Sequence, residues 1–204
     1  CTVSADLVVV AEEVSKHLQG IFKFSVVDKE DSTLMKAAAA GMDAVKFLGV
    51  NVPDSSVFME NYATTLGNLV ALPKSIRDNP ASKIEVVTHE AQHVLQFQES
   101  KVTFAWLYLT KATDRAQYES DAYAAGLAVR SWLTGVSPGD GELTWVVAAL
   151  VRGYHLRAED ASYAETALKS HVASIRDGIY MTKAARTTIA FLEEKYPELK
   201  GTVH

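Results

Sequence analysis

The pentapeptide His89-Glu90-Ala91-Gln92-His93 constrains this chain more than any other feature. On an α-helix, residues four apart lie on the same face, so the two imidazoles can bind one metal ion together. Glu90 lies beside them and can take a proton from a water that the metal activates. Because five residues can also match by chance, the flanking sequence has to show whether this segment forms a metal-binding helix.

The flanking sequence predicts a helix with one packed face. Asn79-Pro80 interrupts the preceding segment, because the residue before a proline disfavours helical geometry. Ser82 and Glu85 then fit a capping box, with Ser82 as the N-cap and Glu85 reaching back to it. Both histidines fall on a stripe next to the apolar one, although two solvated histidines on a surface helix would give the same pattern. The apolar residues at helical spacing that could face a core are Ile84, Val87, Ala91, Val94 and Leu95.

Two histidines leave a catalytic zinc site one ligand short, since such a site typically has three protein ligands and one open position. A third histidine six residues after His93 is excluded, because that position holds Glu99. No cysteine lies nearby either. A carboxylate from a later helix remains, and the segment from 113 to about 133 provides two candidates, Glu119 and Asp121.

An HExxH sequence followed by a glutamate on a second helix resembles the gluzincin branch of the zincin metallopeptidases. The chain is most similar to small bacterial and phage-type gluzincin-like domains, whose second motif reads Tyr-Glu-x-(Glu/Asp)-Ala-(Asp/Tyr). Here that motif is matched by Tyr118-Glu119-Ser120-Asp121-Ala122-Tyr123. The resemblance covers about residues 57–135 and is specific only at its two short motifs. It implies that His89, His93 and Glu119 bind one Zn²⁺ ion, with Glu90 as the general base.

The chain departs from the gluzincin pattern at one position. Many gluzincins have an aspartate four residues after the ligand glutamate, where it orients a ligating histidine. Here Tyr123 occupies that place and could form the hydrogen bond instead. In an alternative register Asp121 matches the family's aspartate, and Gln117, a poor zinc ligand, takes the ligand position. Glu119 is therefore the preferred third ligand and Asp121 the alternative.

Residues that could stabilise an oxyanion during hydrolysis are less well defined. Tyr123 is close to the second motif, and Tyr154-His155 is the best downstream cluster, with Arg152 and Arg157 nearby. The alternative interpretation is structural: Tyr154 is an amphipathic helix residue, and His155 is a cation near a helix C-terminus. Spacing alone does not place either side chain over the metal.

The pattern of apolar residues predicts an α+β fold dominated by helix. The resemblance to gluzincins implies a zincin-like core whose small sheet lies beside the HExxH helix. The segment 68–72 would either be an edge strand that pairs with an extended substrate or close the sheet. The turn-rich segment 135–141 separates a catalytic core, residues 1–135, from a helical extension, residues 136–204, within one domain. Strands are expected at 22–27, 56–62 and 67–73, and further helices at 5–18, 32–48, 102–110, 113–133, 142–156, 158–175 and 182–195.

Composition narrows the classes of partner. The 204 residues, 48% of them hydrophobic, are enough for one sizeable core. The net charge of −5 and the absence of a basic cluster argue against nucleic acid or an anionic membrane. No run of about 18 apolar residues predicts a membrane span. The only cysteine, Cys1, cannot form an internal disulfide. It would be the anchored residue of a bacterial lipoprotein, or simply the point at which this sequence starts.

The motifs together predict a zinc-dependent hydrolase, in the first place a metallopeptidase that acts on a peptide or protein. The alternative is a zincin-fold structural or binding protein, in a phage particle or surface assembly, that retains zinc for stability. An open coordination position in a groove would favour the enzyme, and a fourth protein ligand would favour the structural role. Cleavage preference, compartment and oligomeric state are not encoded in any motif.

Overall fold

The computed structural model describes residues 6–33, 35–37, 63–154 and 158–203, and all structural statements below refer to these residues. Helices dominate and one small three-stranded sheet is present, which confirms a helix-rich α+β class. The strands are β1 (Ser25–Asp28), β2 (Thr64–Leu66) and β3 (Leu69–Leu72). The helices are α1 (Leu7–Phe22), α4 (Lys74–Arg77), α5 (Pro80–Thr110), α6 (Ala112–Thr134), α7 (Asp140–Tyr154), α8 (Ala158–Arg176) and α9 (Lys183–Lys195), followed by the 3-10 turn η1 (Pro197–Leu199).

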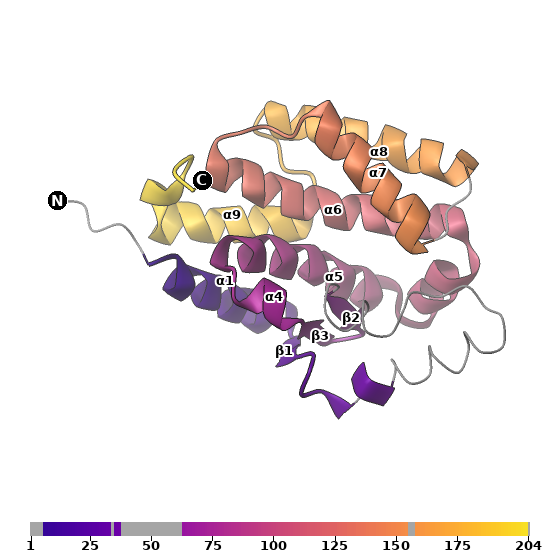
Figure 1. Cartoon of the computed structure of the whole chain (residues 1–204), viewed down its shortest axis with the longest axis horizontal. Helices are drawn as coiled ribbons and strands as arrows, with labels where there is room; N and C mark the ends of the chain where they lie inside the picture. Colours follow the sequence, from indigo (N-terminus) through magenta and orange to yellow (C-terminus); the bar gives the residue numbers. More distant parts are fainter. Residues whose placement is uncertain (1–5, 34, 38–62, 155–157, 204) are drawn as a thin grey trace.

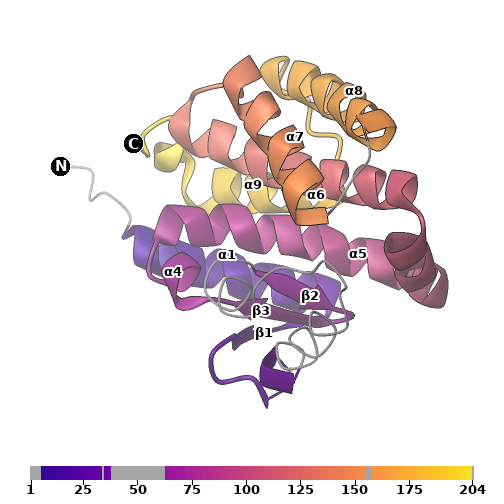
Figure 2. The same cartoon turned by 45° about the vertical axis from the view of Figure 1, so that its right-hand side comes forward.

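The elements form layers that place α5 and α6 in the middle of the molecule. From one side to the other, Figures 1 and 2 show the sheet, then α1 with α5, then α6 with α9, and finally α7 with α8. Helix α5 packs most extensively against α6, and α6 also contacts α8 and α9. Alanine and glycine occupy much of the buried surface of α6, which lets its neighbours approach closely. None of the described helices is long and apolar enough to cross a membrane.

The sheet has the order β1-β3-β2, so β3 is its central strand. Strand β1 runs parallel to β3 and β2 runs antiparallel to it; Val70 of β3 lies opposite Val26 on one side and Thr65 on the other. Because β3 is paired on both sides, the segment 68–72 closes the sheet and does not form an edge. The strand expected at 56–62 and most of the helix expected at 32–48 lie outside the described residues, as does Cys1.

The hairpin between β2 and β3 differs from the prediction. The segment 64–66 was expected to connect two strands, but it is itself strand β2, and the turn lies at Gly67 and Asn68. Gly67 has a φ of +61°, which side chains of L-residues rarely adopt, so this glycine allows the tight turn. The prediction placed the turn too early because it gave the two threonines of 64–66, which favour strands, to the connection.

Helix α5 begins earlier and ends later than the sequence suggested. The Ser82 backbone N–H donates to Asn79 Oδ1 at 3.1 Å, and Pro80 occupies the first helical position. The predicted capping box is therefore wrong, because Asn79 provides the cap and Glu85 forms an ion pair with Arg130. No glycine or further proline interrupts the chain up to Thr110, so the separate helix expected at 102–110 is the end of α5.

Two other predictions for this region are confirmed. The apolar stripe of α5 is buried, and it comprises Ile84, Val87, Ala91, Val94 and Leu95. Helix α6 ends at Gly135, whose φ of +70° and backbone N–H bond to the carbonyl of Ser131 form a left-handed C-cap. These two features set the packed face of α5 and the length of α6, the two helices that carry the sequence motifs.

Candidate metal centre

Three side chains from α5 and α6 converge on one point between the helices. The ligand atoms of His89, His93 and Glu119 all lie within 4.8 Å of one another. Glu119 Oε1 is 3.4 Å from His93 Nε2, and Glu119 Oε2 is 3.9 Å from His89 Nε2. A tetrahedral zinc ion with bonds of about 2.1 Å holds its ligand atoms about 3.4 Å apart. Two of the spacings, 3.4 and 3.9 Å, are close to this value, so the two imidazoles and the carboxylate could hold a metal ion.

The helical period and the direction of the two helices explain this convergence. His89 and His93 lie one turn apart on α5, whereas Glu119 and Gly126 lie about two turns apart on one face of α6. The helices are antiparallel, so Glu119 meets His93 and Gly126 meets Glu85. A Cβ atom added to Gly126 would lie 3.1 Å from Glu85 Cγ. The glycine therefore permits the close approach of α5 and α6 that brings the carboxylate to the histidines.

The surroundings shift the pKa values of the two histidines in opposite directions. Burial and the neighbouring His93 lower the pKa of His89 to about 3, so this imidazole is neutral. Burial alone would also lower the pKa of His93, but the carboxylates of Glu119 and Glu90 outweigh it and raise the pKa of His93 to about 9. Since a metal needs a neutral imidazole, metal binding here would release one proton.

Gln96 orients the second histidine. His93 Nδ1 lies 2.9 Å from Gln96 Oε1, and Gln96 Nε2 donates to the backbone carbonyl of Tyr118 at 3.0 Å. Because that carbonyl holds the amide nitrogen, the amide oxygen faces the ring and accepts a hydrogen bond from Nδ1–H. His93 Nε2 then faces Glu119. Tyr123, which the sequence offered as a residue that could orient a ligating histidine, places its ring edge-on against His89, with the ring centroids 4.8 Å apart.

Glu90 is buried beside the three candidate ligands. Its Oε1 is 4.0 Å from His89 Nε2, and its Oε2 accepts a hydrogen bond from Thr65 Oγ1 at 2.6 Å. Burial raises the pKa of Glu90. Thr65 belongs to β2. A residue of the sheet therefore fixes the carboxylate of Glu90, which lies next to the two histidines on α5. Sequence reasoning missed Thr65, because nothing in the sequence links residue 65 to residue 90.

A buried lysine contacts the neighbouring residue of the same strand. Lys29 is fully buried, and its Nζ donates to Thr64 Oγ1 at 2.8 Å. Burial lowers the pKa of Lys29 to about 8, although the carboxylates of Glu90 and Glu30 act in the opposite direction. Adjacent residues of β2 thus contact a buried ammonium group and the buried carboxylate of Glu90. A lysine in a mostly polar stretch of sequence carries no signal of burial, so this residue was also missed.

The remaining predicted site residues lie elsewhere or outside the described part. Asp121 accepts a hydrogen bond from Gln117 Nε2 at 2.9 Å, and its carboxylate is 2.9 Å from His171 Nε2 on α8. Residues two positions apart on a helix point in directions that differ by about 200°. The structure accordingly brings Glu119, and not Asp121, to the histidines. Tyr154 is the last residue of α7 and only its main chain is described, and His155 lies outside the described residues.

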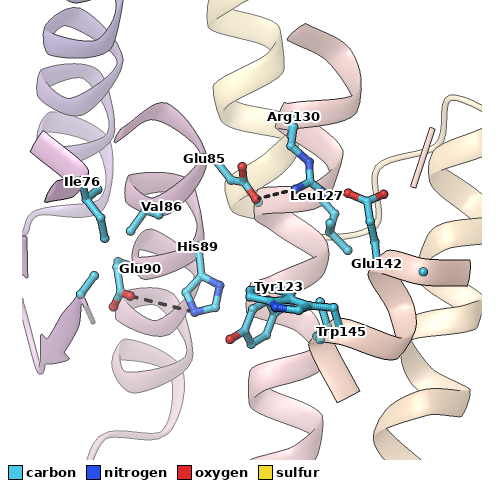
Figure 3. A pocket seen from close by; sticks show the side chains of 14 residues that line it. Ile76, Glu85, Val86, His89, Glu90, Tyr123, Leu127, Arg130, Glu142 and Trp145 are labelled. Atoms are coloured by element: carbon cyan, nitrogen blue, oxygen red, sulfur yellow. Dashed lines mark hydrogen bonds and ion pairs between the residues drawn. The ribbon is translucent and has the colours of Figure 1, made fainter. Parts of the chain in front are cut away.

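A cavity of about 600 Å³ opens beside His89 and Glu90 (Figure 3). Its walls come mainly from α5, α6 and α7, and its volume is typical of pockets that bind small molecules or parts of peptides. The apolar and aromatic lining includes Val86, Leu127, Val146, Tyr123 and Trp145, and the other charged lining residues are Glu85, Arg130 and Glu142. The candidate metal centre therefore adjoins a space that could hold a substrate.

Comparisons of the chain with protein-family models, with curated proteins and with solved structures found no match. The resemblance to gluzincins accordingly rests on the two sequence motifs, and the candidate site rests on its own geometry.

Proposed function

We propose that this protein is a zinc-dependent hydrolase, and specifically a gluzincin-like metallopeptidase with a zincin-like core in residues 1–135. The observation that carries the proposal is the convergence of His89, His93 and Glu119 on two antiparallel helices, with Glu90 buried next to them. Two imidazoles and one carboxylate are a donor set of catalytic zinc sites. This chemistry is independent of any fold-level likeness.

The surroundings of the three residues favour catalysis over a purely structural metal. A structural zinc site is closed by a fourth protein ligand. Among the described residues, no fourth histidine, cysteine, aspartate or glutamate joins this cluster. The cavity instead reaches His89 and Glu90, so a substrate group and a water molecule have a route to the site. These observations support the enzyme over a zincin-fold binding protein that keeps zinc for stability.

Zinc bound at this site would polarise a substrate carbonyl and lower the pKa of a water molecule. Thr65 holds Glu90 Oε2, and Glu90 Oε1 lies on the side of His89, so this carboxylate would accept the proton of that water. The same carboxyl group would then return the proton to the leaving amine. Tyr123 lines the cavity next to His89, and its hydroxyl would donate a hydrogen bond to the carbonyl oxygen as negative charge develops on it.

Zinc content tests the ligand set. The wild-type protein should bind one zinc ion, and the variants His89→Ala, His93→Ala and Glu119→Ala should each lose most of it. Asp121→Ala is the matched control, because this acid lies two residues from Glu119 but faces α8. Full zinc retention in all three ligand variants would exclude the proposed site, and zinc loss in Asp121→Ala alone would reassign the third ligand.

Turnover tests the role of Glu90. The variant Glu90→Gln should keep its zinc and lose hydrolysis of a fluorogenic peptide library, since the amide cannot accept the proton. Undiminished turnover in Glu90→Gln would remove Glu90 as the general base. A zinc-loaded wild-type protein that cleaves no member of the library would favour the structural or binding role instead.

A further inference from the structure

The end of the cavity farthest from the histidines carries two carboxylates and only one guanidinium group. Arg130 on α6 forms ion pairs with Glu142 on α7 and with Glu85 on α5, the latter at 3.8 Å between Nη1 and Oε1. Ionised, the three side chains sum to one negative charge. Each is about one-third exposed and lines the cavity (Figure 3). Burial raises the pKa of Glu85 although Arg130 acts to lower it, so the shared guanidinium does not fully offset the cost of burying this carboxylate.

Between this acidic end and the histidines, the cavity is apolar and aromatic. Val86 and Leu127 line it from α5 and α6, and Trp145 lines it from α7. Trp145 is 65% exposed, which is unusual for so large an apolar side chain. An exposed indole at the mouth of a pocket offers apolar area to a ligand and a ring face to a cation.

The spacing of the lining residues along the helices suits a long side chain. On α6, Arg130 lies seven residues after Tyr123, which contacts His89, and at 1.5 Å per residue this stretch spans about 10 Å. On α5, Glu85 lies four residues before His89, or about 6 Å along the helix. A group bound beside the metal would reach this end of the cavity through an extended stem such as those of lysine and arginine.

We propose that this cavity is a specificity pocket for a basic side chain of the substrate. The stem of the substrate side chain lies along Val86, Leu127 and Trp145. The cationic end of that side chain pairs with Glu85 and Glu142. The inference rests on the proposed peptidase function and names its substrate class. A cation would bring the acidic end from one net negative charge to neutrality. An anionic side chain would meet two carboxylates, because Arg130 is already engaged by both. An apolar side chain would cover the walls but leave the extra negative charge uncompensated.

Matched peptides test this charge requirement directly. An uncharged, acetylated and amidated host peptide carries lysine, norleucine or glutamate at each position in turn; norleucine has the stem of lysine without its ammonium group. The wild-type enzyme should cleave the best lysine peptide about tenfold faster, in kcat/KM, than its norleucine counterpart, and the glutamate peptide should be the poorest. Equal or faster cleavage of the norleucine peptide at every position would overturn the proposal in favour of an apolar pocket.

Variants locate the preference in the acidic end of the cavity. Glu142→Gln and Glu85→Gln should lower the lysine-to-norleucine ratio severalfold without changing the zinc content. Glu165→Gln is the control, because this acid lies on α8, pairs with Lys169 and is not among the residues that line the cavity. An unchanged ratio in both cavity variants would overturn the proposal. If either variant fails to fold, the wild-type ratio still provides the test, since it should fall as NaCl rises from 50 to 500 mM.

A binding measurement separates this inference from the proposed reaction. Zinc-loaded Glu90→Gln protein is titrated with the same three peptides, and binding is followed by tryptophan emission, with Trp145→Phe as the reference for the signal. Tighter binding of the lysine peptide in the absence of any wild-type turnover would support the pocket and contradict the peptidase. Turnover by the wild type with equal affinity for lysine and norleucine peptides would contradict the pocket and leave the peptidase standing.

Discussion

Replacing Gln96 with leucine should weaken zinc binding although it removes no ligand. Gln96 connects His93 Nδ1, at 2.9 Å, with the carbonyl of Tyr118, at 3.0 Å. Leucine nearly preserves the volume but makes neither hydrogen bond, so the ring of His93 loses the group that fixes its orientation and its tautomer. Loss of such a partner lowers metal affinity about 10- to 100-fold. This corresponds to about 1.4–2.7 kcal/mol of binding free energy.

The same substitution should also lower the stability of the metal-free protein, because it leaves a buried N–H and a carbonyl without this partner, at a cost of about 1–3 kcal/mol. Gln92→Leu is the matched control. Gln92 lies one turn earlier on α5, and its Oε1 accepts the backbone N–H of Ala184 at the start of α9, at 3.3 Å. Both variants should therefore be less stable than the wild type, but only Gln96→Leu should bind zinc more weakly.

Competition with a chromophoric chelator at pH 7.5 measures the zinc dissociation constants, and urea unfolding of the metal-free proteins measures the stabilities. A zinc dissociation constant of Gln96→Leu within twofold of the wild type would show that Gln96 does not support the zinc site. An equal loss of zinc affinity in Gln92→Leu would contradict this role as well, since the effect would then follow from the general stability of α5.

Three further predictions concern the sheet and the turns. Thr65→Val should lower kcat about 10- to 100-fold at unchanged zinc content, because Glu90 loses its orienting bond, and Thr65→Ser should restore most of the activity; full activity of the valine variant would contradict this. Burial lowers the pKa of Lys29 in the folded protein to about 8, from an ordinary value of 10.5. Between these two pH values folding releases the proton of Lys29. The free energy of unfolding should therefore rise with pH in this range, by up to about 3 kcal/mol. Lys29→Met should lack this rise in urea unfolding at pH 7.5 and 10.5, and an equal rise in both proteins would argue against it. Gly135→Ala should destabilise the protein by about 1–2 kcal/mol, because the φ of Gly135 is +70° and an added Cβ would lie 3.1 Å from the backbone of Gly201. Gly20→Ala is the control; it lies where an added Cβ meets no atom within 4 Å, and it should stabilise the protein by about 0.5–1 kcal/mol. Thermal unfolding compares the two variants, and equal effects would refute the strain at Gly135.

Several features of the candidate site could be read from the sequence because they depend on neighbours a few residues apart. The 3.6-residue period alone places His89 and His93 on one face of a helix and the apolar stripe on another, and the structure has both. The end of α6 at Gly135 was also predictable, since a left-handed cap needs only that one residue. The capping box failed because two local signals competed, and Asn79 before Pro80 provides the cap in place of Ser82.

The sequence by itself determined the helical period of the metal-binding face, and the tertiary structure decided everything that meets this face from another element. The choice between Glu119 and Asp121 depends on the register of α6 against α5, because a change of two positions rotates a side chain by about 200°. That register follows from the packing of whole helices, including the close approach at Gly126. Thr65 reaches Glu90 only because the sheet packs on α5. Such contacts join residues that are far apart in the chain, and their free energies depend on burial and shape, which no short stretch of sequence contains.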